Sequence, residues 1–363
     1  MSAAYATIDC QTNCGACRLL ETGDRWRVQL HTVDDSLERL RPEWDRLLAA
    51  SDANLFFPAS SWQLLWWRHF GHQYLPRVVT VRDHAGRLTG IAPLMTPRDR
   101  PDQTLLLIGG TEVADYLDLI VDASVAREAR LALLDAVRVH LPWRTLDLHC
   151  LPGGSGTPAA LDEAMAGGGI SVRHEQEDVC PYVPLLGSWE GYLGGLNKKD
   201  RHELRRKLRR AVDDQGAEWR TITGPDDLQP TLDAFIALHR KSSAAKAEFM
   251  TGEMASYFRD LAEQTLAQGT LRMGVLWVGD TPTAGAMGFA QGDRFYLYNS
   301  GYNPEYAAHS VGIAAVGLLL RAAAEEGLAI FDFLQGNESY KYTLGAVDTP
   351  VYRATATREP KDE

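Results

Sequence analysis

The 363-residue sequence predicts an α/β protein of the α+β kind, with two similar domains in tandem, each a mixed twisted sheet flanked by helices. One order of strands and helices occurs twice, each copy contains a hairpin of the same design, and each continues through a strand, a crossover helix and another strand. The hairpins, TVRDHAGRLTGIAP and LWVGDTPTAGAMGF, share an apolar strand, a polar turn and a return strand with small residues. Residues 1–24 are expected to form an N-terminal tail.

The first domain is expected over residues 25–186. Its predicted elements are the strand 26–31, helices 35–50 and 60–70, the hairpin 77–95, strands 104–108 and 116–121, the helix 125–140, the strand 145–148, a helix near 158–166 and the strand 170–174.

The head of the strand 116–121 carries three candidate ligands of the acceptor substrate: Asp115, Tyr116 and Asp118. Turn capping is the competing explanation for this group. Beyond the strand, Asp122 and Ser124 occupy the place of a helix-opening glycine, and an acidic residue repels a pyrophosphate. The first domain is therefore expected to shape the acceptor side of a site.

A basic linker helix is expected over residues 187–215. Leucines at helical spacing predict one inward stripe, and the basic side chains fan around the remaining surface. Arginine binds phosphate bidentately, so Arg201, Arg205 and Arg209 are candidate substrate ligands. A solvated helix face is the alternative interpretation.

The second domain is expected over residues 216–363. Its predicted elements are the strand 218–222, helices 226–239 and 252–267, the hairpin 271–290, the strand from 295, a helix opening at 308–312, and the strand 329–333.

The helix opening at 308–312 is the predicted acyl-donor site. The preceding strand alternates aromatic and apolar residues and ends at Asn299, Ser300 and Gly301. The first N–H groups of a helix have no intrahelical partner, so they can hold a pyrophosphate. The predicted donor-binding residues are Asn299, Ser300, Gly301, His309, Ser310, Val311 and Gly312.

The segments YNSGYNPEY, HSVGI and FDFLQGNESYK resemble the GNAT acyltransferase superfamily, and more closely its branch of Fem peptidyltransferases and CelD/BcsL-like acetyltransferases of polysaccharide biosynthesis. The resemblance covers residues 26–358 and implies tandem GNAT-like domains, with acetyl-CoA or another acyl-CoA as cosubstrate. It favours a sugar, a polysaccharide precursor or a cell-envelope intermediate as acceptor. The usual GNAT loop carries further glycines, whereas only Gly312 is present here.

Three residues near the last predicted strand are candidate catalytic groups: Lys341, Asp332 and Tyr340. The resemblance to the Fem branch implies that Lys341 lies by the reacting centre and stabilises the oxyanion. Asp332 or Glu338 could accept a proton from an attacking amine. The competing interpretations are a lysine extended along Tyr340 at the rim, and an Asp332 that anchors a neighbouring backbone N–H.

Direct attack of an amine or hydroxyl on an acyl-CoA thioester is the first functional expectation. The second is an aminoacyl-tRNA donor, as in Fem enzymes, which the basic helix favours and the net charge of −11 opposes. The third is a non-catalytic tandem domain that binds a phosphorylated metabolite.

Composition narrows these possibilities. The net charge of −11 opposes a DNA-coating protein. No apolar run is long enough to span a bilayer and no secretory signal is apparent, so a cytoplasmic location is expected. Cys10, Cys14 and Cys17 have a spacing used for iron–sulfur clusters, but an unstructured tail is favoured, and no metal is expected.

Overall fold

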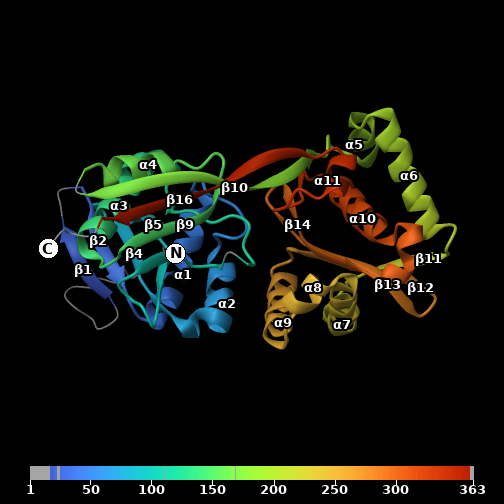
Figure 1. Ribbon diagram of the computed structural model, residues 1–363, viewed down its shortest axis with the longest axis horizontal. Helices are drawn as coiled ribbons and strands as arrows, with labels where there is room; N and C mark the ends of the chain where they lie inside the picture. Colours follow the sequence, from blue (N-terminus) through green and yellow to red (C-terminus); the bar gives the residue numbers. More distant parts are fainter. Residues whose placement is uncertain (1–16, 23–24, 111, 168, 360–363) are drawn as a thin grey trace, which may run out of the picture. The chain divides into compact units, whose positions relative to one another are not determined.

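The computed structural model describes residues 17–22, 25–110, 112–167 and 169–359, which form two compact units (Figure 1). Unit 1 contains the described residues up to 177 and from 350 onward, and unit 2 contains residues 178–349. The final residues belong to unit 1 because β16 (Val347–Arg358) pairs antiparallel with β9 (Thr145–Pro152). The sequence predicted domains over 25–186 and 216–363 instead. None of the helices described is long and apolar enough to cross a membrane.

Unit 1 contains a sheet in the order β1-β2-β4-β5-β8. Its strands are β1 (Cys17–Thr22), β2 (Arg27–His31), β4 (Val78–Arg82), β5 (Leu88–Ala92) and β8 (Ile120–Val121). β1 pairs antiparallel with β2, so the tail expected over residues 1–24 includes a strand that begins at Cys17. Cys10 and Cys14 lie outside the described residues.

The other strands of unit 1 lie in the order β16-β9-β7-β6-β3, and β7 is parallel to β9. Three of them are β3 (Tyr74–Pro76), β6 (Leu94–Pro97) and β7 (Thr104–Leu107). The helices of the unit are α1 (Asp34–Ala49), α2 (Ser60–Phe70), α3 (Ala126–His140) and α4 (Thr157–Met165).

The strands of unit 2 follow the order β11-β12-β13-β14-β15-β10. They are β11 (Ala217–Thr221), β12 (Leu271–Val278), β13 (Thr281–Gln291), β14 (Arg294–Tyr302), β15 (Ile330–Asp332) and the end of β10 (Ile170–Pro184). β11 to β14 pair antiparallel in chain order, as β2, β4, β5 and β8 do in unit 1. The predicted tandem repeat is confirmed.

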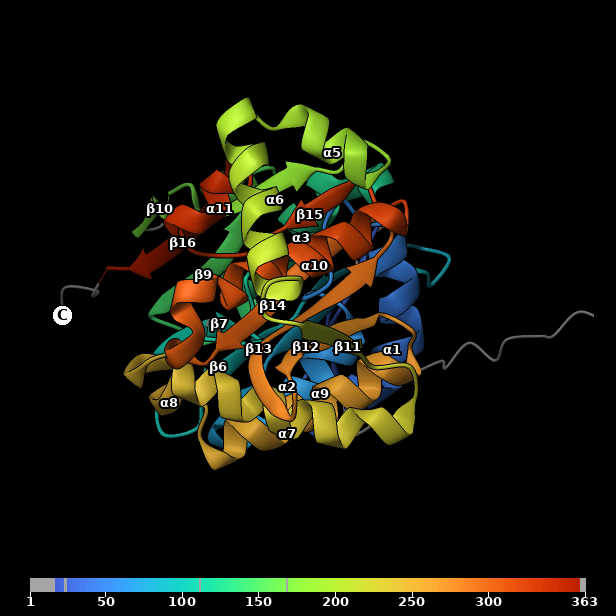
Figure 2. The ribbon, with the colours of Figure 1, turned by 90° about the vertical axis from the view of Figure 1, so that its right-hand side faces the viewer.

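Helices cover both faces of the sheet of unit 2. Figure 2 shows α7, α8 and α9 on one side of β13 and β14, with α10 and α6 on the other. The helices of the unit are α5 (Trp189–Gly195), α6 (Lys198–Val212), α7 (Pro225–Ser242), α8 (Ala244–Phe249), α9 (Gly252–Ala267), α10 (Val311–Glu325) and α11 (Ser339–Thr343).

The apolar core on the α10 side fixes this layering. Phe295 of β14 and Phe331 of β15 stack with their ring centres 4.7 Å apart. α6 packs closely on α10 at Gly317, where an added Cβ would lie 3.3 Å from Leu208 and 3.4 Å from Leu204. The leucine stripe predicted for the basic helix therefore faces α10.

A charged network joins three strand segments of unit 1. The His149 ring contacts Oδ2 of Asp147 at 3.1 Å and Oε1 of Glu177 at 2.5 Å. Arg353 holds the same Asp147 carboxylate through two hydrogen bonds, of 2.8 and 2.7 Å. Hydrogen bonds to Asp147 and Glu177 raise the pKa of His149 to about 9. The imidazolium is therefore the stable form at neutral pH.

This network predicts a pH-dependent stability. A pKa raised from 6.5 to about 9 means that the folded state binds the proton more tightly, so the contribution of His149 is complete below pH 6.5 and disappears as the pH rises through 9. We expect the stability difference between wild type and His149→Gln to shrink by about 2 kcal/mol over that range, after allowance for solvent screening. Denaturant unfolding at both pH values measures it, with His202→Gln on exposed α6 as control. Parallel pH profiles for wild type and His149→Gln would refute the assignment.

Candidate functional site

Two strands of unit 2 separate where the candidate site begins. β14 and β15 run parallel, and their pairing stops at Tyr296 and Asp332. β14 continues to Tyr302, and among the described strands only β13 pairs with this stretch. On the separating edge, the Ser300 carbonyl accepts from Lys246 and the Tyr302 N–H donates to Ser242, so a ligand could contact only the backbone groups that remain or replace these two contacts.

A β-bulge interrupts this stretch of β14. Residues 287 and 288 of β13 are consecutive, but their partners, Asn299 and Leu297, are not, so Tyr298 is an extra residue. The Tyr298 ring stacks on Phe258 of α9, with centres 5.3 Å apart. Because a bulge bends its strand and re-aims the following side chains, it determines which face Asn299 and its neighbours present.

The three predicted donor-binding residues at the end of β14 contact α7 and α8. The Asn299 amide oxygen lies 2.8 Å from Nε2 of His239 on α7. An added Cβ on Gly301 would lie 2.5 Å from the His239 backbone nitrogen, so α7 requires a glycine there. The Ser300 carbonyl accepts a hydrogen bond from Nζ of Lys246 on α8. The side chain of Asn299 thus holds α7, and the Ser300 carbonyl holds Lys246.

The other predicted donor-binding residues meet at the start of α10. Ser310 has a left-handed backbone (φ 60°) and makes no side-chain capping hydrogen bond. Gly312 lies against β14, since an added Cβ would be 3.2 Å from the Tyr302 ring. The first N–H groups of α10, from Val311 onward, therefore lie uncapped beside the end of β14 and favour an anion.

The basic helix α6 reaches this position with a residue that the sequence did not single out. Arg210 donates a 3.2 Å hydrogen bond to the Ala308 carbonyl, just before α10. Of the predicted candidates, Arg201 contacts the Leu193 carbonyl at 3.4 Å and Arg205 pairs with Glu190 at 3.0 Å. Both therefore point to α5. Arg209 is exposed on the same helix.

The buried Asp332 carboxylate is held by an arginine side chain and a backbone N–H. Its side chain is 0% exposed, and Oδ2 pairs with Arg294 at 2.8 Å. Oδ1 accepts a 2.9 Å hydrogen bond from the N–H of Leu334, a residue with a left-handed backbone (φ 57°). Asp332 thereby anchors a neighbouring backbone N–H, which is the competing interpretation offered for it above.

Lys341 belongs to α11, and its side chain extends into the loop that follows β15. Its side chain is 3% exposed, and Nζ lies 2.9 Å from Oε2 of Glu338. The same ammonium donates to the carbonyls of Leu334, Gln335 and Gly336, at 3.1, 2.8 and 2.9 Å. The predicted oxyanion role of Lys341 stays a prediction, and these contacts give it the further task of holding the loop.

Two further predicted groups lie at this loop. The Glu338 side chain is 59% exposed. Gly336, beside the Glu338 carboxylate, has φ 106°, a conformation that favours glycine. Tyr340 packs edge-on against Phe333. Burial, and then the Glu338 charge, raise the pKa of the Tyr340 phenol, so it stays protonated at neutral pH.

Two titratable groups near the end of β14 are not among those predicted from the sequence. Burial lowers the pKa of His239 to about 4, and the charge of Lys246 adds to this effect. Burial also lowers the pKa of Lys246, whereas the charge of Glu338 opposes it. Lys246 and Glu338 therefore lie within electrostatic range of each other. In the described residues, no cluster of His, Cys, Asp and Glu could hold a metal ion.

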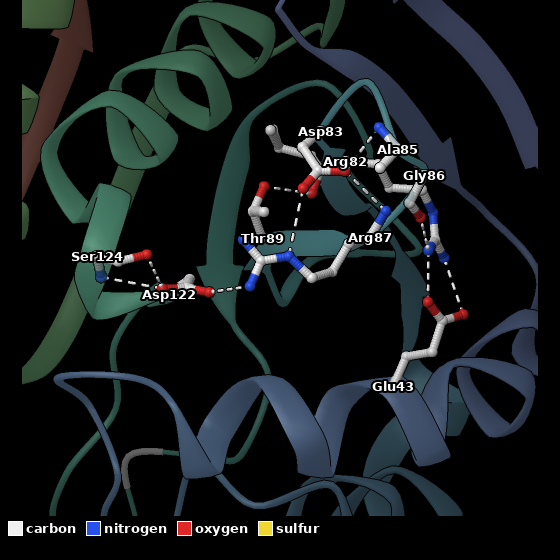
Figure 3. A network of polar contacts seen from close by, with 10 residues as sticks. Glu43, Arg82, Asp83, Ala85, Gly86, Arg87, Thr89, Asp122 and Ser124 are labelled. Carbon is white, nitrogen blue, oxygen red and sulfur yellow. Dashed lines mark hydrogen bonds and ion pairs between the residues drawn. The ribbon is translucent and has the colours of Figure 1, made fainter.

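The helix start of unit 1 that corresponds to α10 carries its own carboxylate (Figure 3). Asp122 accepts hydrogen bonds from the Ser124 N–H at 2.9 Å and from Arg87 at 2.9 Å, which fixes it before α3. The Ser124 hydrogen bonds lower the pKa of Asp122, so it is ionised at neutral pH. A negative charge thus already occupies the position where a pyrophosphate would bind in unit 1.

Most of the predicted acceptor ligands of unit 1 are in its core. Tyr116 is 3% exposed and Asp118 is 2% exposed. Asp118 accepts hydrogen bonds from the Thr157 hydroxyl and the Leu119 N–H, and burial raises its pKa. Only Asp115 is partly exposed.

Residues 198–342, most of unit 2, match the family model of the acetyltransferase (GNAT) domain. This part of the chain is a GNAT domain. Its α10 and separating strands β14 and β15 are the elements described above.

Solved structures resemble nearly the whole chain. FemX has a TM-score of 0.63 at 12% identity, with 86% of this chain and 95% of that chain covered. L-PGS from Bacillus licheniformis has a TM-score of 0.55 at 13% identity, with 94% and 95% covered. A tandem GNAT protein from the clavulanic acid biosynthesis pathway has a TM-score of 0.50 at 16% identity, with 92% and 100% covered. No curated protein matches the chain. The tandem GNAT fold of the Fem-like branch predicted from the sequence is confirmed.

The contacts of Lys341 predict a structural effect that can be measured without a substrate. Lys341→Met would leave three carbonyls and the Glu338 carboxylate without their shared donor. We expect unit 2 to lose about 3 kcal/mol of unfolding free energy, whereas Lys199→Met on the exposed start of α6 should change it by less than about 0.5 kcal/mol. Denaturant unfolding followed by tryptophan fluorescence compares the two. Equal stabilities would show that the loop does not need the ammonium.

Proposed function

We propose that the protein transfers an acyl group, in first place acetyl, from a CoA thioester directly to an amine or hydroxyl of a small molecule, a sugar or a cell-envelope precursor. The GNAT domain in unit 2 supports an acyltransferase. In this proposal the donor lies along the edge of β14 that separates from β15, and the acceptor meets its thioester in the space between these strands.

One observation carries the proposal: the contrast between the two helix starts. α10 begins at Ser310 with no capping side chain, beside the end of β14. In unit 1 the corresponding helix α3 follows directly on the 3-10 turn Ala123–Val125, whose first N–H groups face the carboxylate of its N-cap, Asp122. A doubly charged pyrophosphate is stabilised by free helix N–H groups and repelled by a carboxylate, so the donor belongs to unit 2.

The residues around the thioester have distinct proposed roles. Attack of the acceptor nitrogen on the thioester carbonyl forms a tetrahedral oxyanion, whose collapse breaks the carbon–sulfur bond. The exposed Glu338 carboxylate accepts the proton from nitrogen, and the protonated Tyr340 phenol donates to the departing thiolate. A backbone N–H at the Tyr298 bulge stabilises the oxyanion, or Lys341 does so by giving up one of its contacts with the loop.

An aminoacyl-tRNA donor is the second candidate, because the fold resembles FemX and L-PGS. Arg210 beside the start of α10 would suit a phosphate of either donor. The net charge of −11 opposes a large nucleic-acid contact. A protein that binds a phosphorylated metabolite without catalysis is the remaining outcome.

A negative charge introduced at position 310 tests the proposed donor site. Asp and Asn both tolerate the left-handed backbone of Ser310 and both cap helices, so neither Ser310→Asp nor Ser310→Asn should disturb the fold. Only Asp adds a negative charge against the pyrophosphate. We expect CoA affinity to fall at least about tenfold in Ser310→Asp and less than about threefold in Ser310→Asn.

Isothermal titration with CoA, acetyl-CoA and bulk aminoacyl-tRNA measures this effect and separates the candidate donors. If the two variants bound the wild-type ligand with equal affinity, its phosphate would not bind at the start of α10. Binding of tRNA alone, reduced in Ser310→Asp, would favour the second candidate.

A further inference from the structure

In the part of the chain that the structure describes, the ammonium of Lys246 lies beside β14 and pairs with no carboxylate. Ser243 caps the start of α8 by accepting from the Lys246 N–H, which fixes the backbone of Lys246. Its half-buried side chain donates to the Ser300 carbonyl. A lysine has three N–H donors, and one is used here. Among the described residues, no carboxylate lies within ion-pair distance of this ammonium.

Other lysines of unit 2 do have such partners. Lys241, near the end of α7, pairs with Glu305 at 3.3 Å, and the buried Lys341 pairs with Glu338 at 2.9 Å. Placing a cation out of water costs free energy unless an anion or several hydrogen bonds compensate for it. Lys246 therefore has donors and charge available for an anionic ligand.

Lys246 and the donor's helix approach β14 from opposite faces of the sheet. Gly301 packs against His239 of α7, whereas the next residue, Tyr302, packs against Gly312 of α10. Successive residues of a strand point to opposite faces. α8 follows α7 on its side of the sheet, as Figure 2 shows. A donor whose phosphates lie at α10 leaves the face of Lys246 to the acceptor.

We propose that Lys246 binds an acidic group of the acceptor, so that the acceptor is an amine that carries a carboxylate or a phosphate near its nucleophilic nitrogen. This inference rests on the proposed acyl transfer and names its substrate class. Glu338 lies within electrostatic range of Lys246 and is exposed. An acceptor with an ammonium and an acid group would therefore place its nitrogen toward Glu338 and its anion toward Lys246.

Matched acceptors and a matched variant test this inference. The probes are pairs in which only one member is acidic: alanine and alaninamide, glutamate and its diamide, glucosamine 6-phosphate and glucosamine. Lys246→Gln removes the charge but keeps an N–H donor for Ser300, and Lys199→Gln on exposed α6 is the control. CoA release from acetyl-CoA is followed with a thiol reagent.

We expect wild type to prefer the acidic member of a pair, and Lys246→Gln to raise its KM at least about tenfold while the KM of the neutral member stays the same. The amino acids and the sugar phosphate distinguish carboxylate from phosphate. If the KM rose equally for both members of a pair, Lys246 would serve only to hold the Ser300 carbonyl. A weaker CoA affinity by titration would make it a donor contact. Either result overturns the inference.

A second measurement needs no turnover. Acetylation of Lys246 by dilute acetic anhydride, followed by mass spectrometry in the presence of CoA, reports access to the ammonium. Acidic probes should protect Lys246 at least about threefold, and their neutral partners should not. Protection by none of the acidic probes would overturn the inference, while CoA binding by the same protein would leave the proposed function in place.

Discussion

The buried carboxylate of Asp332 determines where β14 and β15 separate. It pairs with Arg294 on β14 and accepts the N–H of Leu334, which holds that leucine in a left-handed conformation. This conformation is unfavourable for leucine, so it persists only because surrounding contacts impose it. The chain then turns away from β14, and the carbonyls of Leu334, Gln335 and Gly336 accept from the ammonium of Lys341. The separating edge of β14, and with it the proposed donor path, depends on this fixed turn.

Similar topologies in the two units lead to opposite electrostatics at one position. In unit 1, Asp122 caps the 3-10 turn Ala123–Val125 that leads into α3, and Arg87 holds the Asp122 carboxylate. In unit 2, Ser310 opens α10 without a cap, and Arg210 of α6 contacts the preceding loop. A helix start attracts anions in either unit, but a carboxylate already satisfies it in unit 1. This difference in charge is the reason for proposing that the donor binds to unit 2.

Much of the architecture could be predicted from local sequence patterns. The repeated hairpins and crossover helices predicted the tandem fold, and the polar turn before Val311 predicted the start of α10. The return of β16 to unit 1 could not be predicted, because it depends on pairing with a strand some 200 residues earlier. The strand at Cys17–Thr22 was also missed, since a single edge strand leaves a weak pattern.

The site was less predictable than the fold, because its geometry follows from backbone conformations that side-chain patterns do not indicate. The enclosure of Lys341 depends on a left-handed leucine, where a glycine would have signalled the turn. Lys246 lies on a six-residue helix, too short to show a period. Asp118 looked like a polar turn residue, but the Thr157 hydroxyl and the Leu119 N–H satisfy it within the core.

Amide hydrogen exchange with and without bound donor tests the central claim most directly. CoA, acetyl-CoA and aminoacyl-tRNA would each be compared at saturation, with peptides that cover the starts of α10 and α3. The account predicts that the donor slows exchange in peptides that contain Val311 and Gly312, and leaves those that contain Ser124 and Val125 unchanged. Protection at the start of α3, or saturating donor binding without protection at α10, would contradict it.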